Sequence, residues 1–292
     1  MDKKTFAYFI APSIILMVLL MVVPLVASVW LSLNTITLQT IDSPEFVGLA
    51  NYAEILQLTE DSTSRFWSTM GFTLSYIAIT VPTQIFLGLI IALLLDQVRS
   101  FRGVYIAATL LPFIVTPLVG TIMYRNPLRD GELVPWVLDE FFSLDVNFFL
   151  PDTIQYVIFA HAIWYVTPFA IVTLFAGLQT IPQEPLEAAR VDGANWFQRL
   201  WHVVLPNLRS LFILLALINM MDAYRVFDNI FVLTGQSGTY SHVQTIMYYN
   251  YDIVNRGRLG LANAMSVLTV IGVMVILIPW LYLTYRQQME ER

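Results

Sequence analysis

Six long apolar runs set the pattern of hydrophobic and polar positions along the chain. A helix needs about 20 mostly apolar residues to cross a hydrocarbon layer about 30 Å thick, and every run is long enough. The first run is too long for a secretory signal, whose apolar core has about 7–15 residues, and we expect a bend in it near Pro24. The pattern predicts an all-α polytopic membrane protein, with one transmembrane domain over residues 1–292. The predicted helices are 6–33, 66–95, 103–124, 153–183, 208–233 and 259–285.

The positively charged residues predict the side of the membrane on which each loop lies, because Lys and Arg gather in cytoplasmic loops. With six spans, both termini lie on the same side. If that side is the cytosol, the cytosolic segments hold Lys3, Lys4, Arg99, Arg102, Arg190, Arg199, Arg209, Arg286 and Arg292. The longer outer segments then hold Arg65, Arg125, Arg129, Arg256 and Arg258. We therefore expect cytosolic termini and a cytosolic loop at residues 181–206.

This loop, residues 181–206, predicts two short amphipathic helices joined by a glycine. Pro182 suits the start of a helix, where a missing N–H costs nothing, and Glu187 lies near the positive end of that helix. Gly193 stands where the chain must reverse, because glycine accepts a positive φ without strain. A second helix is expected over 194–204. Its apolar face holds Trp196, Leu200 and Val203.

The same loop carries a sequence resemblance. Glu187-Ala188-Ala189 is followed after three residues by Gly193, and then by Val203, Leu205 and Pro206. This spacing resembles the EAA loop of ABC importer permeases. The segments A-A-R-V-D-G-A and F-D-N-I-F-V-L-T-G are also similar to sugar permeases of the maltose-importer permease family, and the resemblance covers nearly the whole chain. Val203 stands where that family usually has isoleucine, which is a mild departure.

The resemblance implies a permease subunit, without catalytic activity of its own, in a binding-protein-dependent importer of the bacterial cytoplasmic membrane. It assigns coupling to an ATPase to Glu187, Ala188, Ala189, Asp192 and Gly193. The implied partners are two ATPase subunits, which would hold ATP and Mg²⁺, a second and usually different permease subunit, and an extracytoplasmic solute-binding protein. The implied solute is a sugar or a derivative such as an oligosaccharide, glycoside or polyol. A glycine-rich turn at 233–238 would begin an outer loop near the binding protein.

Three charges lie deep in the predicted fifth span: Asp222, Arg225 and Asp228. Ionisable groups at this depth are costly and usually face a bundle interior or a water-filled path. Their i, i+3 spacings on one helix predict that both carboxylates pair with the guanidinium. Our hypothesis is a polar wall that offers hydrogen-bond partners and an aromatic face to a sugar. Its residues are Asp222, Tyr224, Arg225, Asp228 and Asn229. The alternative is an ion network that fastens this helix to its neighbours.

Composition supports the membrane assignment and excludes several kinds of chemistry. The chain is 57% hydrophobic and 12% charged, whereas soluble domains have about 25% charged residues. Without cysteine it has no disulfide and no thiolate nucleophile. Its lysines are Lys3 and Lys4, and neither follows a glycine, so there is no nucleotide-binding P-loop. We expect no metal site, no nucleic acid partner, and packing or interfacial roles for the histidines.

Other classes of function remain open at this point. A permease for a solute other than a sugar would have the same pattern. A secondary transporter would explain six spans and intramembrane charges, but the chain shows no inverted repeat, and the 181–206 loop would have no role. An intramembrane hydrolase is poorly supported, because Asp222 and Asp228 have an arginine between them and make a poor aspartyl dyad.

Overall fold

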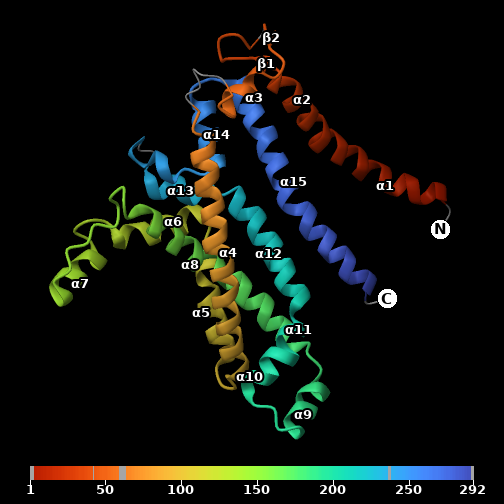
Figure 1. The fold of residues 1–292 in the computed structure, drawn as a ribbon, viewed down its shortest axis with the longest axis vertical. Helices are drawn as coiled ribbons and strands as arrows, with labels where there is room; N and C mark the ends of the chain where they lie inside the picture. The colour runs from red at the N-terminus through yellow and green to blue at the C-terminus, as the bar shows by residue number, and fades with distance from the viewer. Residues whose placement is uncertain (1–2, 42, 59–63, 236–237, 291–292) are drawn as a thin grey trace. The chain divides into compact units, whose positions relative to one another are not determined.

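The computed structural model describes residues 3–41, 43–58, 64–235 and 238–290, and nearly all of its regular structure is helical (Figure 1). One short antiparallel ladder joins β1 (Asn34–Thr35) to β2 (Glu45–Phe46). The predicted all-α fold is therefore confirmed.

Four helices of the described chain are long and apolar enough to cross a membrane. They are the segment Tyr8–Ser32, α4 (Phe66–Gln97), α8 (Ile154–Gln179) and α15 (Leu259–Glu290). Two strongly bent helix pairs bring the number to six if each pair counts as one span. These six segments overlap the six apolar runs of the sequence, although the second pair, Trp196–Asn207 with Arg209–Tyr224, also includes the second helix of the 181–206 loop.

The predicted third span, 103–124, is wrong as a single helix. It consists of α5 (Arg102–Ile114) and α6 (Pro117–Arg125), and the helices on either side of the break bend by 97°. Val115 and Thr116 between them are extended, with ψ of 139° and 144°. A proline disfavours helical ψ in the residue before it, and Pro117 imposes this on Thr116.

Pro24 is accommodated differently, by a π-helical turn that precedes it. The first segment comprises α1 (Lys3–Met17), the π turn η1 (Val18–Val22) and α2 (Val23–Ser32), in which Pro24 lies in the first turn. A proline removes a backbone donor and crowds the carbonyl four residues earlier, and single π turns occur as local distortions inside α-helices. The distortion expected near Pro24 therefore takes the form of a π turn within one 25-residue span.

The chain folds as two compact units. The first comprises Met1–Thr69 and Ile246–Met274, and includes α3 (Ala50–Ile55) and α14 (Ile246–Asn255). In it, Ser28 donates a hydrogen bond to Asn263 Oδ1 at 2.7 Å, which ties α2 to α15. Asn51 donates from Nδ2 to the carbonyl of Ser32 at 2.8 Å and to that of Asn34 at 3.0 Å, so the loop after the first span is fixed to the end of that span.

The second unit comprises Met70–Thr245 and Val275–Arg292 and contains the candidate functional site. Beyond the elements already given, its helices are η2 (Asn126–Leu128), α7 (Leu133–Phe142), α9 (Gln183–Val191), α10 (Trp196–Arg199), η3 (Leu200–Val204), α11 (Leu205–Asn207), α12 (Arg209–Tyr224), α13 (Asp228–Thr234) and η4 (Gly238–Val243). Its core joins α4, α8 and α12 through the buried residues Ala92, Ala170, Leu174, Ile181, Leu208 and Leu215. The prediction that residues 1–292 act as one transmembrane domain stays a prediction.

Candidate functional site

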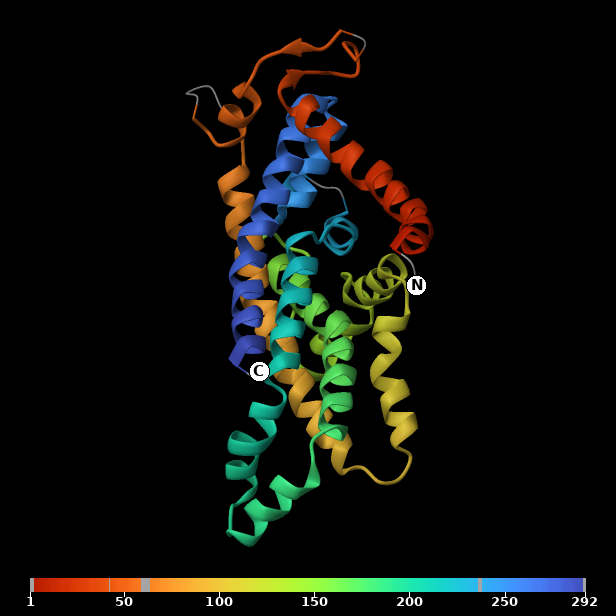
Figure 2. The same cartoon turned by 90° about the vertical axis from the view of Figure 1, so that its right-hand side faces the viewer.

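The helix–glycine–helix loop predicted from the sequence is present. It lies between α8 and α12 and extends beyond their ends, as the green to teal segment of Figure 2 shows. The first helix, α9, covers Gln183–Val191, and the second begins at Trp196 and continues through the π turn η3 to Asn207. The second helix begins two residues later than predicted, because Asn195 caps it.

Gly193 closes α9 with a Schellman motif. Its φ of +79° lies in the left-handed region that favours glycine. The Ala194 N–H donates to the Ala189 carbonyl at 2.9 Å, and the Gly193 N–H donates to the Arg190 carbonyl at 3.1 Å. These are the two bonds that define the motif, and they satisfy carbonyls that the helix end would otherwise leave without partners. The glycine elbow therefore has a specific geometry that fixes where the chain leaves α9.

A capping box starts the second helix directly after this elbow. Asn195 Oδ1 accepts from the Gln198 N–H at 2.9 Å, and Gln198 Oε1 accepts from the Asn195 N–H at 2.8 Å. This reciprocal pattern stabilises helix starts. Our sequence reasoning missed these two residues, although Asn195 and Gln198 stand at the spacing that signals such a box. Arg199 adds a hydrogen bond from Nη1 to the Ala194 carbonyl at 2.6 Å, so the elbow and the second helix form one rigid connection.

Both ends of the loop are anchored in the core of the second unit. Ile181, before α9, is 6% exposed, and Leu208, after α11, is 1% exposed. Both belong to the buried cluster that joins α4, α8 and α12. A Cβ at Gly177 would clash with Leu208 and Leu211, so α8 and α12 approach each other closely beside these anchors. The loop is therefore held to α8 and α12 through tightly packed side chains, and packed cores resist local deformation.

The tip of the loop exposes a group of large apolar side chains. Val191 is 88% exposed, and the rings of Phe197 and Trp201 stack at 6.3 Å with 63% and 60% of their surfaces exposed. Of the predicted coupling residues, Glu187, Ala188, Asp192 and Gly193 are exposed and Ala189 is half-buried. An apolar patch of this kind on a polar loop is typical of a surface that another protein covers.

The predicted fifth span, 208–233, is wrong as a continuous helix. The helix α12 ends at Tyr224, and α13 begins at Asp228. Arg225 caps α12 with φ of −100° and ψ of 8°, and Phe227 is non-helical with φ of −137° and ψ of −59°. The i, i+3 relationship between Arg225 and Asp228 is therefore lost.

The charges of this segment form one ion pair. Arg225 Nη2 lies 3.1 Å from Asp222 Oδ1, and the two side chains are 53% and 69% exposed. Within the described residues, Asp228 forms no ion pair with Arg225, so the predicted triad is wrong because the helix breaks between them. Asp228 is exposed, whereas Tyr224 is 1% exposed and faces the protein interior. The three exposed charges remain available to water or solute, and their role in a pathway stays a prediction.

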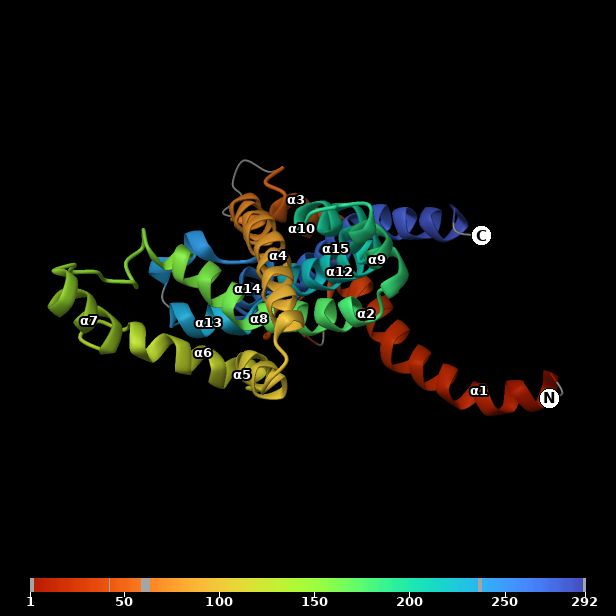
Figure 3. The same ribbon diagram turned by 90° about the horizontal axis from the view of Figure 1, so that it is seen from below.

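Asn229 lies in a buried polar joint between three helices. Thr121 on α6 donates from Oγ1 to Asn229 Oδ1 at 3.0 Å. The Thr121 Oγ1 atom also lies 3.2 Å from His161 Nε2 on α8. The ring of His161 stacks on Tyr165 at 5.8 Å and packs against Tyr124 at 5.0 Å. Figures 1 and 3 show α6, α13 and α8 side by side. His161 thus has the packing role expected of it. Our sequence reasoning missed Thr121, because nothing local links it to a residue 108 positions away.

The other histidines also make local or interfacial contacts. His202 hydrogen-bonds the Gln198 carbonyl at 2.9 Å through Nδ1, and His242 hydrogen-bonds the Pro151 carbonyl at 2.8 Å through Nε2. In the described part of the chain, no group of three or more His, Asp or Glu side chains is placed to hold a metal ion. Of the predicted outer turn at 233–238, Gln236 and Ser237 lie outside the described residues, and Gly235 has φ of +62°.

Several helices long and apolar enough to cross a membrane, together with a helix–glycine–helix loop between α8 and α12, are the features expected of an inner-membrane permease component. The chain belongs to the family of binding-protein-dependent transport system inner membrane components, whose family model matches residues 58–287. This membership identifies it as a multi-pass inner-membrane protein and favours the permease over the secondary transporter and the hydrolase.

Comparison with individual proteins gives consistent results. The chain is 32% identical over 285 residues to a trehalose/maltose transport system permease protein of Thermococcus litoralis, covering 96% of this chain and 93% of the relative. It is 33% identical over 269 residues to a trehalose transport system permease protein of Mycobacterium tuberculosis, covering 91% and 84%. Among solved structures, a bacterial importer of the acidic polysaccharide alginate has a chain that matches with a TM-score of 0.81 at 21% identity, over 97% of this chain and 96% of that one. That likeness supports the fold.

Proposed function

We propose that this chain is the transmembrane permease subunit of an ATP-driven bacterial importer for a sugar or sugar derivative, such as an oligosaccharide, glycoside or polyol. The observation that carries the proposal is the loop of residues 181–206, an exposed helix–glycine–helix element whose two ends are anchored in the core. The printed functions of the trehalose and maltose relatives support a sugar as the solute. The fold by itself does not indicate which solute is carried, because a chain of a methionine ABC transporter also matches, with a TM-score of 0.51 over 75% of this chain.

The loop would couple ATP hydrolysis to transport. The exposed side chains of Val191, Phe197 and Trp201 would seat in a groove of an ATPase subunit, with Glu187 at the margin. When two ATPase subunits close on ATP, the loop would move with them. Because Ile181 and Leu208 are fixed in the core, α8 and α12 would follow, and access to the pathway would switch between the two sides of the membrane.

The chain itself would not be an enzyme. It has no P-loop, and both of its lysines lie at the N-terminus, so ATP and Mg²⁺ would be held by the ATPase partners. A second permease subunit, which we expect to be a different chain, would form the other half of the pathway. An extracytoplasmic solute-binding protein would deliver the sugar, in keeping with the family to which the chain belongs.

The pathway would run past the break between α12 and α13. Broken membrane helices expose backbone and polar side chains, and such breaks are tolerated where they line a cavity. Asp222, Arg225 and Asp228 lie at this break with exposed side chains that can meet sugar hydroxyls. Asn229 is half-buried and engaged by Thr121, and Tyr224 is buried, so these two would shape the wall from behind.

A reconstituted importer tests the proposal. This chain would be co-expressed with its partner permease, ATPase and binding protein, and uptake would be measured in vesicles. The sugar is chosen by screening mono-, di- and modified sugars for thermal stabilisation of the binding protein. Uptake that requires both ATP and the binding protein supports the proposal. Stabilisation of the binding protein by amino acids or ions alone would overturn the sugar assignment and leave the permease role intact. ATP-independent uptake by this chain without partners would overturn the permease role.

A further inference from the structure

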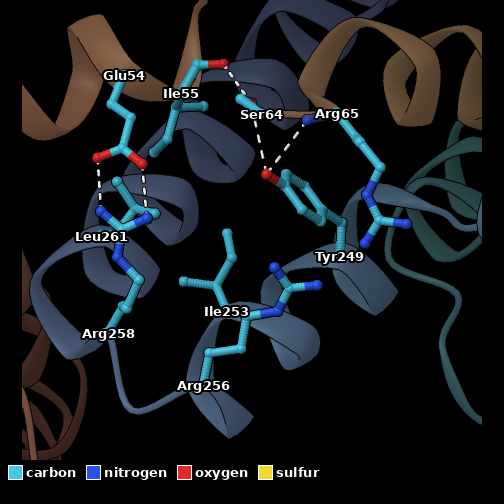
Figure 4. Close-up of a pocket in the computed structure, with 9 residues that line it drawn as sticks. All are labelled: Glu54, Ile55, Ser64, Arg65, Tyr249, Ile253, Arg256, Arg258 and Leu261. Atoms are coloured by element: carbon cyan, nitrogen blue, oxygen red, sulfur yellow. Dashed lines mark hydrogen bonds and ion pairs between the residues drawn. The ribbon is translucent and has the colours of Figure 1, made fainter. Parts of the chain in front are cut away.

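Three of the five arginines on the predicted outer side gather around one small cavity in the first unit. Arg65, Arg256 and Arg258 line it together with Glu54, Ile55, Ser64, Tyr249, Ile253 and Leu261 (Figure 4). We call it the arginine cavity. Positive charge is sparse on the outer face of an inner-membrane protein, so this concentration of guanidinium groups requires an explanation.

Two of the three arginines already have carboxylate partners. Arg258 donates from both terminal nitrogens to the Glu54 carboxylate, each at 2.6 Å, and this bidentate pair raises the pKa of the guanidinium. Arg65 Nη2 lies 3.1 Å from Asp252 Oδ2, and its guanidinium lies over the ring of Tyr249 at 5.4 Å from the centroid. These pairs fix the walls of the arginine cavity but leave no net charge.

Arg256 supplies the excess charge. Its side chain is exposed, and within the described residues it forms no ion pair with a carboxylate. Figure 4 shows its guanidinium directed toward Tyr249 and Ile253, on the side of the cavity opposite the Glu54 carboxylate. Among the described residues, three guanidinium groups meet the carboxylates of Glu54 and Asp252, so this part of the arginine cavity carries one net positive charge and is suited to a monoanion.

The framework that holds these groups is hydrogen-bonded throughout. The Tyr249 hydroxyl accepts from the Arg65 backbone N–H at 3.2 Å and donates to Ser64 Oγ at 3.4 Å, and Ser64 Oγ donates to the Ile55 carbonyl at 2.7 Å. Gly257, with φ of +73°, turns the chain between Arg256 and Arg258 so that both side chains reach the same cavity. The geometry is therefore fixed before any ligand arrives.

Size and depth select the ligand. The cavity volume is about 30 Å³, and one water needs about 10–15 Å³ of such volume, so the cavity has room for two or three water-sized groups, such as oxygens of one phosphate, and not for a sugar ring. Arg65 directly precedes α4, which begins at Phe66, and Arg258 directly precedes α15, which begins at Leu259. The headgroup layer adds roughly 5–8 Å on each side of the hydrocarbon. The guanidinium groups of these residues therefore lie at the level of lipid phosphates, and the half-exposed Trp67 beside them is typical of that level.

We propose that the arginine cavity binds the phosphate group of an anionic phospholipid at the outer boundary of the membrane, with Arg256 as the group that contacts it. Guanidinium groups match phosphate oxygens with two parallel hydrogen bonds. The bound lipid would hold the starts of α4 and α15 to the bilayer surface. This inference does not depend on which solute the importer carries.

Lipid retention by the purified importer complex tests the proposal. The complex would be incubated with phosphatidylglycerol or phosphatidylcholine in mild detergent, and bound lipids would be counted by native mass spectrometry. Wild type is expected to retain phosphatidylglycerol in preference to phosphatidylcholine. Arg256→Gln should weaken this retention about five-fold, the effect of removing one cation near an anionic surface. Arg129→Gln is the matched control, since Arg129 is an exposed arginine of the predicted outer side that does not line the cavity, and it should behave as wild type.

A second variant is expected to act in the opposite direction. Glu54→Gln removes the carboxylate that neutralises Arg258, and it should increase retention of phosphatidylglycerol, which a misfolded protein would not do. Equal retention by wild type and Arg256→Gln would overturn the proposal. If millimolar inorganic phosphate alone abolished the difference in phosphatidylglycerol retention between wild type and Arg256→Gln, the ligand would be a free anion and the lipid would be rejected. Loss of binding-protein capture by Arg256→Gln in phosphatidylcholine nanodiscs, with unchanged lipid retention, would assign the cavity to a protein carboxylate and also reject it.

Discussion

Thr121 donates a hydrogen bond to Asn229 at 3.0 Å, and this bond joins the two segments that the sequence pattern treated as uninterrupted spans. Thr121 lies on α6, after the break at Val115 and Thr116, and Asn229 lies on α13, after the break at Arg225. The two short helices pack on each other and on α8, where His161 completes the joint. Each break is therefore compensated by contact with the other broken segment.

Removal of the Thr121 hydroxyl should destabilise this joint. Thr121→Val keeps the side-chain shape but removes the hydroxyl that lies 3.0 Å from the half-buried Asn229 Oδ1 and 2.7 Å from the Pro117 carbonyl of its own helix, and the loss of a partner costs a fully buried polar group about 1–3 kcal/mol. We expect a lower thermal unfolding temperature of the purified complex, measured by light scattering or intrinsic fluorescence. Thr83→Val is the matched control, because the Thr83 hydroxyl bonds the Ile79 carbonyl of its own helix at 2.6 Å. An equal effect of the two variants would contradict a structural role for the joint.

Gly193 should tolerate asparagine but not valine. The position has φ of +79° and open space around a Cβ, so the backbone angle alone limits substitution. Asparagine visits this region several-fold more often than other residues, whereas an ordinary L residue pays about 1–2 kcal/mol and a β-branched one more. Gly193→Val should lose ATPase subunits during purification or hydrolyse ATP without transport, while Gly193→Asn stays near wild type. Normal uptake by Gly193→Val would remove the elbow from the coupling mechanism.

The charges at the break between α12 and α13 should affect transport more than stability. The exposed pair of Arg225 and Asp222 is worth about 0–1 kcal/mol, so Arg225→Ala should assemble with near-normal stability. Asp228→Asn keeps its shape and most hydrogen bonding but loses its charge. If that carboxylate meets the sugar, uptake should fall while basal ATP hydrolysis survives. Subunit stoichiometry, ATPase rate and vesicle uptake should be measured together, and full uptake by Asp228→Asn would take this residue out of the pathway.

The orientation can be tested with single cysteines, because the chain has none of its own. Asp145 lies in a predicted outer segment and Ser100 in the predicted cytosolic loop between α4 and α5, and both are exposed. The two variants are Asp145→Cys and Ser100→Cys. An impermeant thiol reagent added to intact cells should label position 145 and not position 100. After permeabilisation both should react. The reverse pattern would invert the topology and place the 181–206 loop outside.

The sequence determined the class of fold because hydrophobic length is a local property. Each apolar run is long enough for a membrane helix on its own, and the structure has a helix or a bent pair at each. The loop at 181–206 was equally readable, since Gly193 ends a helix by its own backbone preference; the capping pair Asn195 and Gln198, which the sequence reasoning missed, is also local and starts the next helix within four residues. These features need no knowledge of distant contacts.

The positions of the two helix breaks could be found only from the tertiary structure, because the presence of a proline does not by itself show where a helix breaks. Pro82, Pro112, Pro168 and Pro279 all lie inside helices, yet the chain is extended before Pro117. A helix continues through a proline when its freed carbonyl finds another partner, and it breaks when packing elsewhere rewards the break.

At the second break no proline is present, and the chain leaves the helix at Arg225 while the helix that follows, α13, packs on α6. The pairing expected between Arg225 and Asp228 failed for this reason.

The sequence by itself thus determined the membrane helices, the helix–glycine–helix loop at 181–206 and the absence of a nucleotide-binding motif, all of which depend on residues close together in the chain. Only the tertiary structure decided which distant residues meet. Thr121 reaches Asn229 across 108 positions, and Arg65 joins Arg256 and Arg258 around one cavity although nearly two hundred residues separate them. Such meetings depend on how helices pack, and helix packing is set by the sum of many side-chain contacts that no local pattern encodes.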